Sequence, residues 1–368
     1  MADPRQYFSE QEIERARRYH RPRYLLILWD LALGFAVLAV FAFAWPGDRL
    51  DSSLSSVPPV ARAALEAVVV LAVLELLELP GHAWIGHVRE RRYGFSTQSA
   101  WAWLADRAKG LAVGAALSSG GLAALVALAR VFPKWWALPA AASASGLALA
   151  VSFLAPVILE PLFNRFAPLA DTALADDLRA LAARAGVPVR DVLVCDASRR
   201  TTKHNAYVSG LGRTRRVVVF DTLLARGRPR ELRLIVAHEL GHRRARHVLK
   251  ATGLGMAGSA IFVVSLWALL QWNALPEPGN PRVVPLVLLL GMLLELPGLP
   301  VGAALSRRWE RDADRFSVEL TRDLGAYRAA HLELAKTNLS DLAPPRLLYL
   351  LTFTHPTPPE RLEAAGTA

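Results

Sequence analysis

The sequence is poor in sulfur and in charge. It contains one cysteine, Cys195, and three methionines among 368 residues, and only 20% of its residues are charged. A single cysteine cannot form an internal disulfide, which excludes the small secreted domains that disulfides hold together and fits a reducing cytosolic compartment. Cys195 closes a short apolar run and is predicted to lie in the core of a strand. Neither an internal repeat nor a low-complexity tract interrupts the chain.

Apolar sequence is what the chain has in excess. Hydrophobic residues make up 53% of it, and the mean hydropathy of +0.27 is too high for an ordinary soluble enzyme. Six apolar runs are each long enough to cross a hydrocarbon core of roughly 30 Å as a helix. They span residues 24–45, 60–85, 111–132, 136–159, 251–272 and 283–305. One such run could be a buried core helix, but six leave little soluble core to bury them in, so we expect a polytopic helical membrane protein.

Positive charge lies on alternate connections between these runs. The formal net charge is +11, and arginines crowd the N-terminal segment at 15–23, the second connection at 89–107 and the long segment before residue 250. The intervening connections carry few basic residues. By the positive-inside rule, both termini and the long segment lie on the cytoplasmic side of the cell (inner or plasma) membrane. This distribution explains the basic balance without a nucleic-acid partner.

Residues 160–250 form the one long stretch able to build a soluble unit. The pattern predicts a helix over 171–185, strands over 192–195 and 215–220, a polar, turn-rich segment over 197–214 and a helix over 231–248. We therefore divide the chain into four parts. These are 1–159 with four transmembrane helices, 160–250 as a cytoplasmic unit, 251–305 with two further transmembrane helices, and 306–368 as a cytoplasmic tail.

The most informative motif is His238-Glu239-Leu240-Gly241-His242. On a helix, His238 and His242 project from the same face one turn apart, a spacing that lets two imidazoles hold one zinc ion. Glu239 then lies beside the open coordination position, where it can take a proton from water. The alternative is an accidental spacing, since the chain contains nine histidines. Arginines on both sides of this helix favour a position at or beyond the cytoplasmic membrane surface rather than inside the bilayer.

Catalytic zinc usually has three protein ligands and one open position. His247 is one candidate for the third ligand, although we expect it on the same helix as His242 and off the metal face. Glu310 and Asp314, after the last apolar run, share a helix face at a spacing of four. One can therefore bind the metal while the other orients a histidine ligand. The alternative is a solvated, mixed-charge start of a helix.

With this site, the expected fold class is mainly α. We predict a polytopic helical membrane protein of about six transmembrane helices with a small cytoplasmic α+β zinc-peptidase domain.

These motifs and several others resemble those of the integral-membrane zinc metallopeptidases of the type I CAAX prenyl protease family. The sequence resembles a bacterial-type member of that family. The resemblance holds in order and spacing from about residue 90 to residue 362. It rests on Glu90 with 93–98, 161–166 with 168–169, 205–207, 219–224, 238–242, 306–314, and 355–356 with 360–362.

For the metal centre, the resemblance implies one zinc ion per chain. His238, His242 and Glu310 would bind it. Glu239 would act on the attacking water as the catalytic base, and Asp314 would support the ligands from behind.

For the substrate, the resemblance implies that Asn205 and Ala206 contact the backbone of a bound peptide beside a strand edge. His355 would help to stabilise the oxyanion, and Arg361 would tie the tail to the active site. Judged on their own, Asn205 would be a turn residue and His355, before a proline, a structural one. The family commonly has His-Ser before this asparagine, whereas a lysine and His204 stand here, so His204 does not inherit that histidine's role.

The expected activity is hydrolysis of peptide bonds in a peptide or protein substrate that is membrane-associated or lipidated. An alternative within the peptidases is a quality-control enzyme that cleaves misfolded membrane proteins. A transporter or channel with a structural metal site would use the acids in the apolar runs, Asp30, Glu75, Glu78 and Glu295, but would not need a base beside the metal. A signalling receptor would need an outer sensor domain, for which the outer connections are too short. The sequence assigns no oligomeric state.

Overall fold

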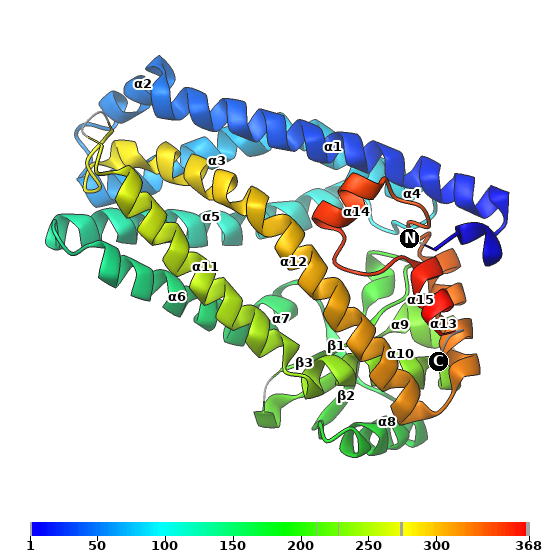
Figure 1. Ribbon diagram of the computed structural model, residues 1–368. Helices are drawn as coiled ribbons and strands as arrows, with labels where there is room; N and C mark the ends of the chain where they lie inside the picture. The colour runs from blue at the N-terminus through cyan, green and yellow to red at the C-terminus, as the bar shows by residue number, and fades with distance from the viewer. Residues whose placement is uncertain (1, 211, 227, 273–274, 366–368) are drawn as a thin grey trace.

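Figure 1 shows the computed structural model, which describes residues 2–210, 212–226, 228–272 and 275–365. Long helices form a bundle at one end of the molecule, and a small sheet with its own helices lies at the other end. The bundle helices are α1 (Glu10–Phe43), α3 (Pro59–Ala83), α5 (Ala100–Val131), α6 (Ala137–Leu154), α11 (His247–Leu269) and α12 (Val284–Thr321). Short helices join them, namely α2 (Trp45–Ser53), α4 (Glu90–Arg92) and α7 (Glu160–Phe163).

Length and composition identify the membrane-crossing helices. Among the described residues, five helical segments are long and apolar enough, namely Glu10–Phe43, Ala100–Val131, Ala137–Phe163, His247–Leu269 and Pro281–Thr321. The remaining predicted span, 60–85, forms α3, which is not among the five and carries Glu66, Glu75 and Glu78. Large apolar side chains stay exposed along the bundle, as at Val301 of α12, which is 69% exposed. Because such a surface is unfavourable in water and suited to lipid, the prediction of a helical membrane protein is confirmed.

Acidic residues inside the bundle pair with a basic one. Arg107 of α5 donates to both carboxylate oxygens of Glu75, at 2.8 and 2.7 Å, and to Nδ1 of His82 at 2.7 Å. The protonated nitrogen of His82 is then Nε2, which donates to Asp30 at 3.2 Å. Ligand atoms of Glu75, Glu78 and His82 lie close enough together to hold a metal ion. Since the Arg107 guanidinium already bonds two of the three, the cluster is an ion-pair network.

The end of the molecule that lies outside the helix bundle, the soluble end, is built on a four-stranded sheet. Its strands follow the order β1-β2-β4-β3. β2 (Asp191–Cys195) and β4 (Arg216–Phe220) are parallel and central, and β1 (Phe166–Pro168) and β3 (Ala206–Ser209) are antiparallel edge strands. Helices α8 (Thr172–Arg184), α9 (Asp221–Arg226) and α10 (Pro229–Arg244) share one core with the sheet. The helix predicted over 171–185 is confirmed as α8, and the strands predicted over 192–195 and 215–220 are confirmed as β2 and β4. The turn-rich prediction for 197–214 is wrong at β3, because four residues are too few to show an alternating pattern.

Two helix boundaries differ from the prediction. The helix expected over 231–248 ends at Arg244, and α11 begins at His247, because Arg246 takes a left-handed conformation with φ 55°. Conversely, α12 continues unbroken for 38 residues, about 57 Å at 1.5 Å per residue. This exceeds a hydrocarbon core of roughly 30 Å, so the last turns of α12 extend beyond the bilayer. The four-part division of the chain stays a prediction, since its boundary at 305 falls within α12.

The C-terminal tail folds back over the soluble end. It consists of α13 (Leu324–Thr337), α14 (Arg346–Thr352) and α15 (Pro358–Ala364). The connection after α13 packs on the start of the chain, where Leu339 shares a hydrophobic cluster with Phe8 and Ile13. Both ends of the chain therefore lie at the same end of the molecule, beside the sheet (Figure 1).

Candidate metal centre and substrate cavity

Three side chains from two helices converge at the soluble end. His238 and His242 come from α10, and Glu310 comes from the extension of α12. The two Nε2 atoms are 3.1 Å apart, His238 Nε2 is 3.3 Å from Glu310 Oε2, and His242 Nε2 is 3.2 Å from Glu310 Oε1. Tetrahedral zinc with bonds of about 2.0 Å separates its ligands by roughly 3.3 Å. The donor set therefore fits a zinc ion in both chemistry and spacing.

The charge of the donors also suits a cation. Glu310 is buried, and its Oε2 atom has no hydrogen-bond partner of good geometry among the described residues. A buried carboxylate oxygen in this state is costly unless positive charge neutralises it. Burial lowers the pKa of His238, but hydrogen bonds with Asp314 and Glu310 outweigh burial and raise it to about 9. The site thus attracts positive charge, as a metal centre must.

Asp314, one turn beyond Glu310 on α12, orients the first histidine. His238 Nδ1 lies 2.9 Å from Asp314 Oδ1. Because the carboxylate accepts from Nδ1, that nitrogen keeps its proton, and Nε2 is the nitrogen that would give up its proton to act as a ligand. Arg361 of α15 holds the same carboxylate, donating from Nε to Oδ2 at 2.8 Å and from a terminal nitrogen to Oδ1. Burial opposes the charge of Arg361, yet Asp314 raises its pKa above the usual value.

His247 supports the second histidine. Its Nδ1 lies 2.9 Å from Nδ1 of His242, and its ring stacks on Trp309 at 4.8 Å. The expectation that His247 continues the helix of His242 is wrong, because the left-handed turn at Arg246 starts a new helix. That turn brings His247 behind His242 and away from the donor atoms. No local pattern predicts this contact, since it depends on one backbone conformation.

Close packing of α10 on α12 brings Glu310 to the histidines. A Cβ atom on Gly241 would lie 3.0 Å from the ring of Phe316 and 3.2 Å from Cα of Ala313. The second contact is with backbone, which could give way only if α12 moved. The glycine of the motif is therefore required by the close approach of the two helices.

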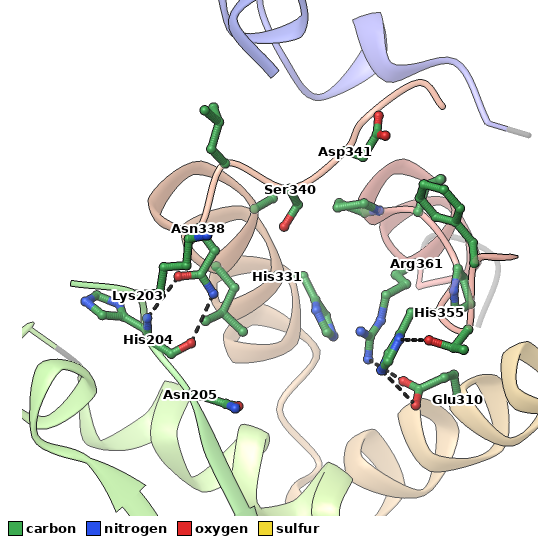
Figure 2. Close-up of a pocket in the computed structure, with 18 of the residues that line it drawn as sticks. Lys203, His204, Asn205, Glu310, His331, Asn338, Ser340, Asp341, His355 and Arg361 are labelled. Atoms are coloured by element: carbon green, nitrogen blue, oxygen red, sulfur yellow. Dashed lines mark hydrogen bonds and ion pairs between the residues drawn. The ribbon is translucent and has the colours of Figure 1, made fainter. Parts of the chain in front are cut away.

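The donor set opens into a cavity of about 650 Å³ (Figure 2). Of the expected site residues, those lining it are Asn205, Ala206, His238, Glu239, Glu310, His355 and Arg361. His242 and Asp314 lie directly behind the lining, in contact with Glu310 and His238 respectively. His331, which no pattern singled out, also lines the cavity, and burial holds its pKa well below the usual value.

Glu239 and His355 face the cavity from different elements. The side chain of Glu239 forms no hydrogen bond or ion pair with another residue in the described ranges, so its carboxylate is available. His355 precedes α15, and its Nε2 lies 3.2 Å from Glu310 Oε1 with the side chain 61% exposed. Its Nδ1 lies 2.9 Å from Thr354 Oγ1. A free carboxylate beside the donors suits a proton acceptor, and an exposed imidazole suits a hydrogen-bond donor to substrate.

Strand β3 turns its free edge toward the cavity. In its antiparallel ladder with β4, the Phe220 N–H donates to the Asn205 carbonyl at 3.0 Å. Hydrogen-bonded pairs alternate along such a ladder. The backbone groups of residues 204, 206 and 208 therefore point away from β4, and Ala206 lines the cavity.

Side chains already occupy both flanks of this edge. The amide oxygen of Asn338 accepts the His204 N–H at 2.9 Å, and its amide nitrogen donates to the His204 carbonyl at 3.0 Å (Figure 2). Arg243, on α10, donates from Nε to the Val208 carbonyl at 3.0 Å. Between them, Ala206 has no hydrogen-bond partner at either backbone group within the described part of the chain. Neither Asn338 nor Arg243 was expected at the site.

Lys203 ties the start of this edge to the membrane helices. Its Nζ donates to Tyr19 of α1 and to Glu90 of α4, both at 2.8 Å. The ammonium also lies 4.6 Å from the ring centre of Phe95. Lys203 therefore has a structural role at the position where this sequence departs from the usual His-Ser of the family. His204 beside it is held through its backbone by Asn338.

The fold and this site define a membrane-embedded metallopeptidase. The chain belongs to peptidase family M48, whose sequence model matches residues 168–368. A second model, described as CAAX prenyl protease N-terminal, five membrane helices, matches residues 2–165. The resemblance found in the sequence is confirmed, and the interpretations as a transporter or a receptor are set aside.

Known proteins resemble the chain over most of its length. It is 27% identical to an uncharacterized metalloprotease, YhfN, of Bacillus subtilis, over 99% of this chain and 88% of that one. It is 28% identical to the CAAX prenyl protease 1 homolog of Arabidopsis thaliana, over 80% of this chain and 71% of that one. The crystal structure of S. mikatae Ste24p superimposes with a TM-score of 0.86 at 23% identity, covering 99% of this chain and 91% of that one. This last likeness establishes the fold.

Proposed function

We propose that the protein is a zinc metalloendopeptidase of the cell membrane that uses Glu239 as its general base. The observation that carries the proposal is the spacing of 3.1 to 3.3 Å among the donor atoms of His238, His242 and Glu310. Asp314 adds to it by selecting the tautomer of His238 that a metal requires. When bound, zinc supplies Lewis acidity, which acidifies a water molecule and polarises a carbonyl group.

The chain's own residues would move the protons. Glu239 accepts a proton from the attacking water, whose oxygen forms the new bond to the scissile carbonyl carbon. As the C–N bond breaks, Glu239 donates that proton to the leaving amine and its carboxylate is restored. His355 donates a hydrogen bond to the oxygen that gains negative charge. The side chain of Asn205 and the free backbone groups of Ala206 would hold the substrate backbone beside the edge of β3.

We assign the catalytic end to the cytoplasmic side. The arginines at 15–23 lie at the start of α1 and those at 307–311 lie on the extension of α12, both at the end of the bundle that carries the sheet. The positive-inside rule favours the cytoplasm for such an end. Both termini share it, as the ion pair of Lys336 with Glu12 at 3.0 Å indicates.

The names of related proteins suggest the class of substrate. Several are named CAAX prenyl proteases, so the first candidate is a lipidated peptide. Tyr24 and Ile27 of the membrane helix α1 line the catalytic cavity, which suits a substrate that arrives from the bilayer. A misfolded membrane protein, the alternative, would meet the same cavity.

Cleavage assays with the purified full-length protein in detergent test this function. Three substrates are compared, namely a farnesylated peptide ending in Cys-aliphatic-aliphatic-X, the same peptide without the lipid, and unfolded β-casein. We expect cleavage that 1,10-phenanthroline abolishes and added Zn²⁺ restores. A preference for the farnesylated peptide supports a processing role, and cleavage of all three supports quality control. Cleavage that ignores the chelator would refute the zinc mechanism, and no cleavage at all would refute the proposed activity.

A further inference from the structure

Helix α14 presents an apolar face that no part of the described chain covers. Leu347 is 68% exposed and Leu350 is 45% exposed, and they lie one turn apart on the same side of the helix. Tyr349 is buried on the other side, and Arg346, at the start of the helix, is exposed. A short helix that is anchored on one side and presents leucines and a basic residue on the other is typical of elements that lie in a membrane surface.

Hydrogen bonds to α12 determine the height of α14 along the bundle. Arg307, which is buried, donates to the carbonyl of Tyr349 at 2.9 Å and to that of Phe353 at 2.6 Å. Its guanidinium also lies 4.7 Å from the ring centre of Tyr349. Because about 20 helical residues cross the hydrocarbon core, α12 leaves the core near residue 304, roughly one turn before Arg307. α14 is therefore bonded to α12 at the level of the lipid headgroups.

The start of the apolar run of helix α1 also indicates that α14 lies at the level of the lipid headgroups. Its apolar run begins at Tyr24, directly after Arg23. Tyr24 and Ile27 line the same cavity as Thr352, which ends α14, and Phe353, which follows it. In Figure 1, α14 lies between α1 and α12. The boundaries between polar and apolar sequence on α1 and on α12 thus both lie near α14.

Exposed apolar side chains also occur on the membrane helices near this boundary. On α1, Leu25 and Leu28 are exposed just after the boundary, and on α12 Val301 is exposed just before it. We propose that α14 docks on the bilayer, with Leu347 and Leu350 among the outermost acyl carbons, and that this contact positions the segment 353–357 at the mouth of the cavity. The docking is independent of the proposed function, whereas its effect on catalysis rests on that function.

The segment 353–357 is where such a contact matters. It carries His355, whose Nε2 lies 3.2 Å from Glu310. Beyond it, Glu360 of α15 accepts hydrogen bonds from the Tyr349 hydroxyl at 2.7 Å and from the Thr357 N–H at 2.9 Å. α14, the segment and α15 therefore form one unit that closes over the donor set. Lipid at Leu347 and Leu350 would hold this unit from outside, as Arg307 holds it from inside.

Site-directed spin labelling of the full-length protein tests the docking. The native cysteine, Cys195, is fully buried, so labels can be attached at introduced cysteines, with the unsubstituted protein as the labelling control. The test position is Leu347→Cys. Val301→Cys provides the lipid reference, and Asp176→Cys, on α8 with a side chain 75% exposed, provides the aqueous reference.

In nanodiscs of phosphatidylcholine and phosphatidylglycerol, oxygen should relax the label at 347 more than a water-soluble nickel chelate does. We expect a depth between those of the two references. A label at 347 as accessible to the nickel chelate as the label at 176 would overturn the docking.

The double variant Leu347→Ser, Leu350→Ser tests the effect on catalysis. Both side chains are exposed, so we expect unchanged zinc content and thermal unfolding. We expect a roughly tenfold lower kcat in nanodiscs, less than the 10²-fold cost of fully misplacing a catalytic group. The matched variant Leu347→Ile, Leu350→Ile should keep wild-type activity. A wild-type kcat in the serine variant would refute the positioning role. If the wild-type protein cleaved nothing, the proposed function would fail while the spin labels still decided the docking.

Discussion

Asn338 pairs with both backbone groups of His204, accepting its N–H at 2.9 Å and donating to its carbonyl at 3.0 Å. A side-chain amide thus occupies the place that a residue of a bound strand would take on the edge of β3. Arg243 blocks the carbonyl of Val208 on the other flank. Ala206 is the one position between them at which a substrate backbone can form both hydrogen bonds. Under the proposed function, this edge would therefore bind a single residue of the substrate rather than a long strand.

Replacing Asn338 by alanine should open a second position on this edge. For a peptide long enough to reach His204, we expect KM to fall a few-fold, since a hydrogen bond contributes about 0.5–1.5 kcal/mol. A peptide shortened so that it cannot reach His204 should show no change. Steady-state kinetics with the two peptides measures the difference. Thr337→Ala is the matched control, because that hydroxyl bonds only Glu333 among the described residues. An equal change in KM for both peptides would contradict the proposal that the substrate backbone binds along the free edge of β3.

Local signals account for what could be predicted from the sequence. The membrane helices show long apolar runs, the central strands show short ones, and His238 and His242 show the spacing of one helical turn. Glu310 was predictable because its own helix face carries Asp314 four residues later. Each of these signals lies within a single element.

Contacts between distant elements account for what could not be predicted. Asn338 reaches His204 across 134 residues of sequence, and nothing near either residue indicates the pairing. His247 meets His242 only because Arg246 adopts a left-handed conformation. The short strand β3 lacks a periodic pattern and becomes a strand by pairing with β4. Such features follow from packing, which the sequence pattern of one segment does not contain.

Glu310→Ala should reduce the zinc content of the purified protein well below one ion per chain. Without this carboxylate, two imidazoles remain, which is one ligand fewer than a catalytic zinc site normally has. Metal analysis by mass spectrometry measures the content. Asp312→Ala is the control, since Asp312 lies on the same helix but is exposed and pairs with Arg315. Unchanged zinc in Glu310→Ala would remove Glu310 from the ligand set.

Arg361→Ala should destabilise the folded protein. The substitution leaves the Asp314 carboxylate buried without the guanidinium that holds both its oxygens. Breaking a buried ion pair in this way costs about 3–5 kcal/mol, so we expect a clearly lower Tm and weaker zinc binding. Thermal unfolding in detergent measures the first effect. Arg328→Ala, at an exposed position of α13, is the control. A Tm equal to that of the control would contradict the role of Arg361.

Asp341→Asn should stabilise the protein at neutral pH. Asp341 is buried at the cavity, and one of its carboxylate oxygens has no hydrogen-bond partner among the residues that the structure describes. Burial raises its pKa from 3.8 to about 6. The folded state therefore holds this proton more tightly than the unfolded state. The contribution of this group to stability is greatest below about pH 4, falls as the pH rises toward 6, and stays lower above it.

At 1.36 kcal/mol for each unit of pKa, the penalty at pH 7 is at most about 3 kcal/mol. We therefore expect Asp341→Asn to raise the Tm at pH 7.5 and to leave it unchanged near pH 4. Thermal unfolding at both pH values measures this, with the exposed Asp176→Asn as the control. An equal shift of Tm at the two pH values would contradict the burial of this charge.

In the proposed mechanism, His238, His242 and Glu310 hold one zinc ion while Glu239 moves the protons. Metal analysis and peptide cleavage, measured on the same preparations of the wild-type and Glu239→Gln proteins, test it most directly. We predict one zinc ion per chain in both proteins and cleavage in the wild type alone, with Glu231→Gln on the same helix retaining both properties. A wild-type protein that cleaves peptides without zinc, or a Glu239→Gln variant that cleaves them at the wild-type rate, would contradict the account.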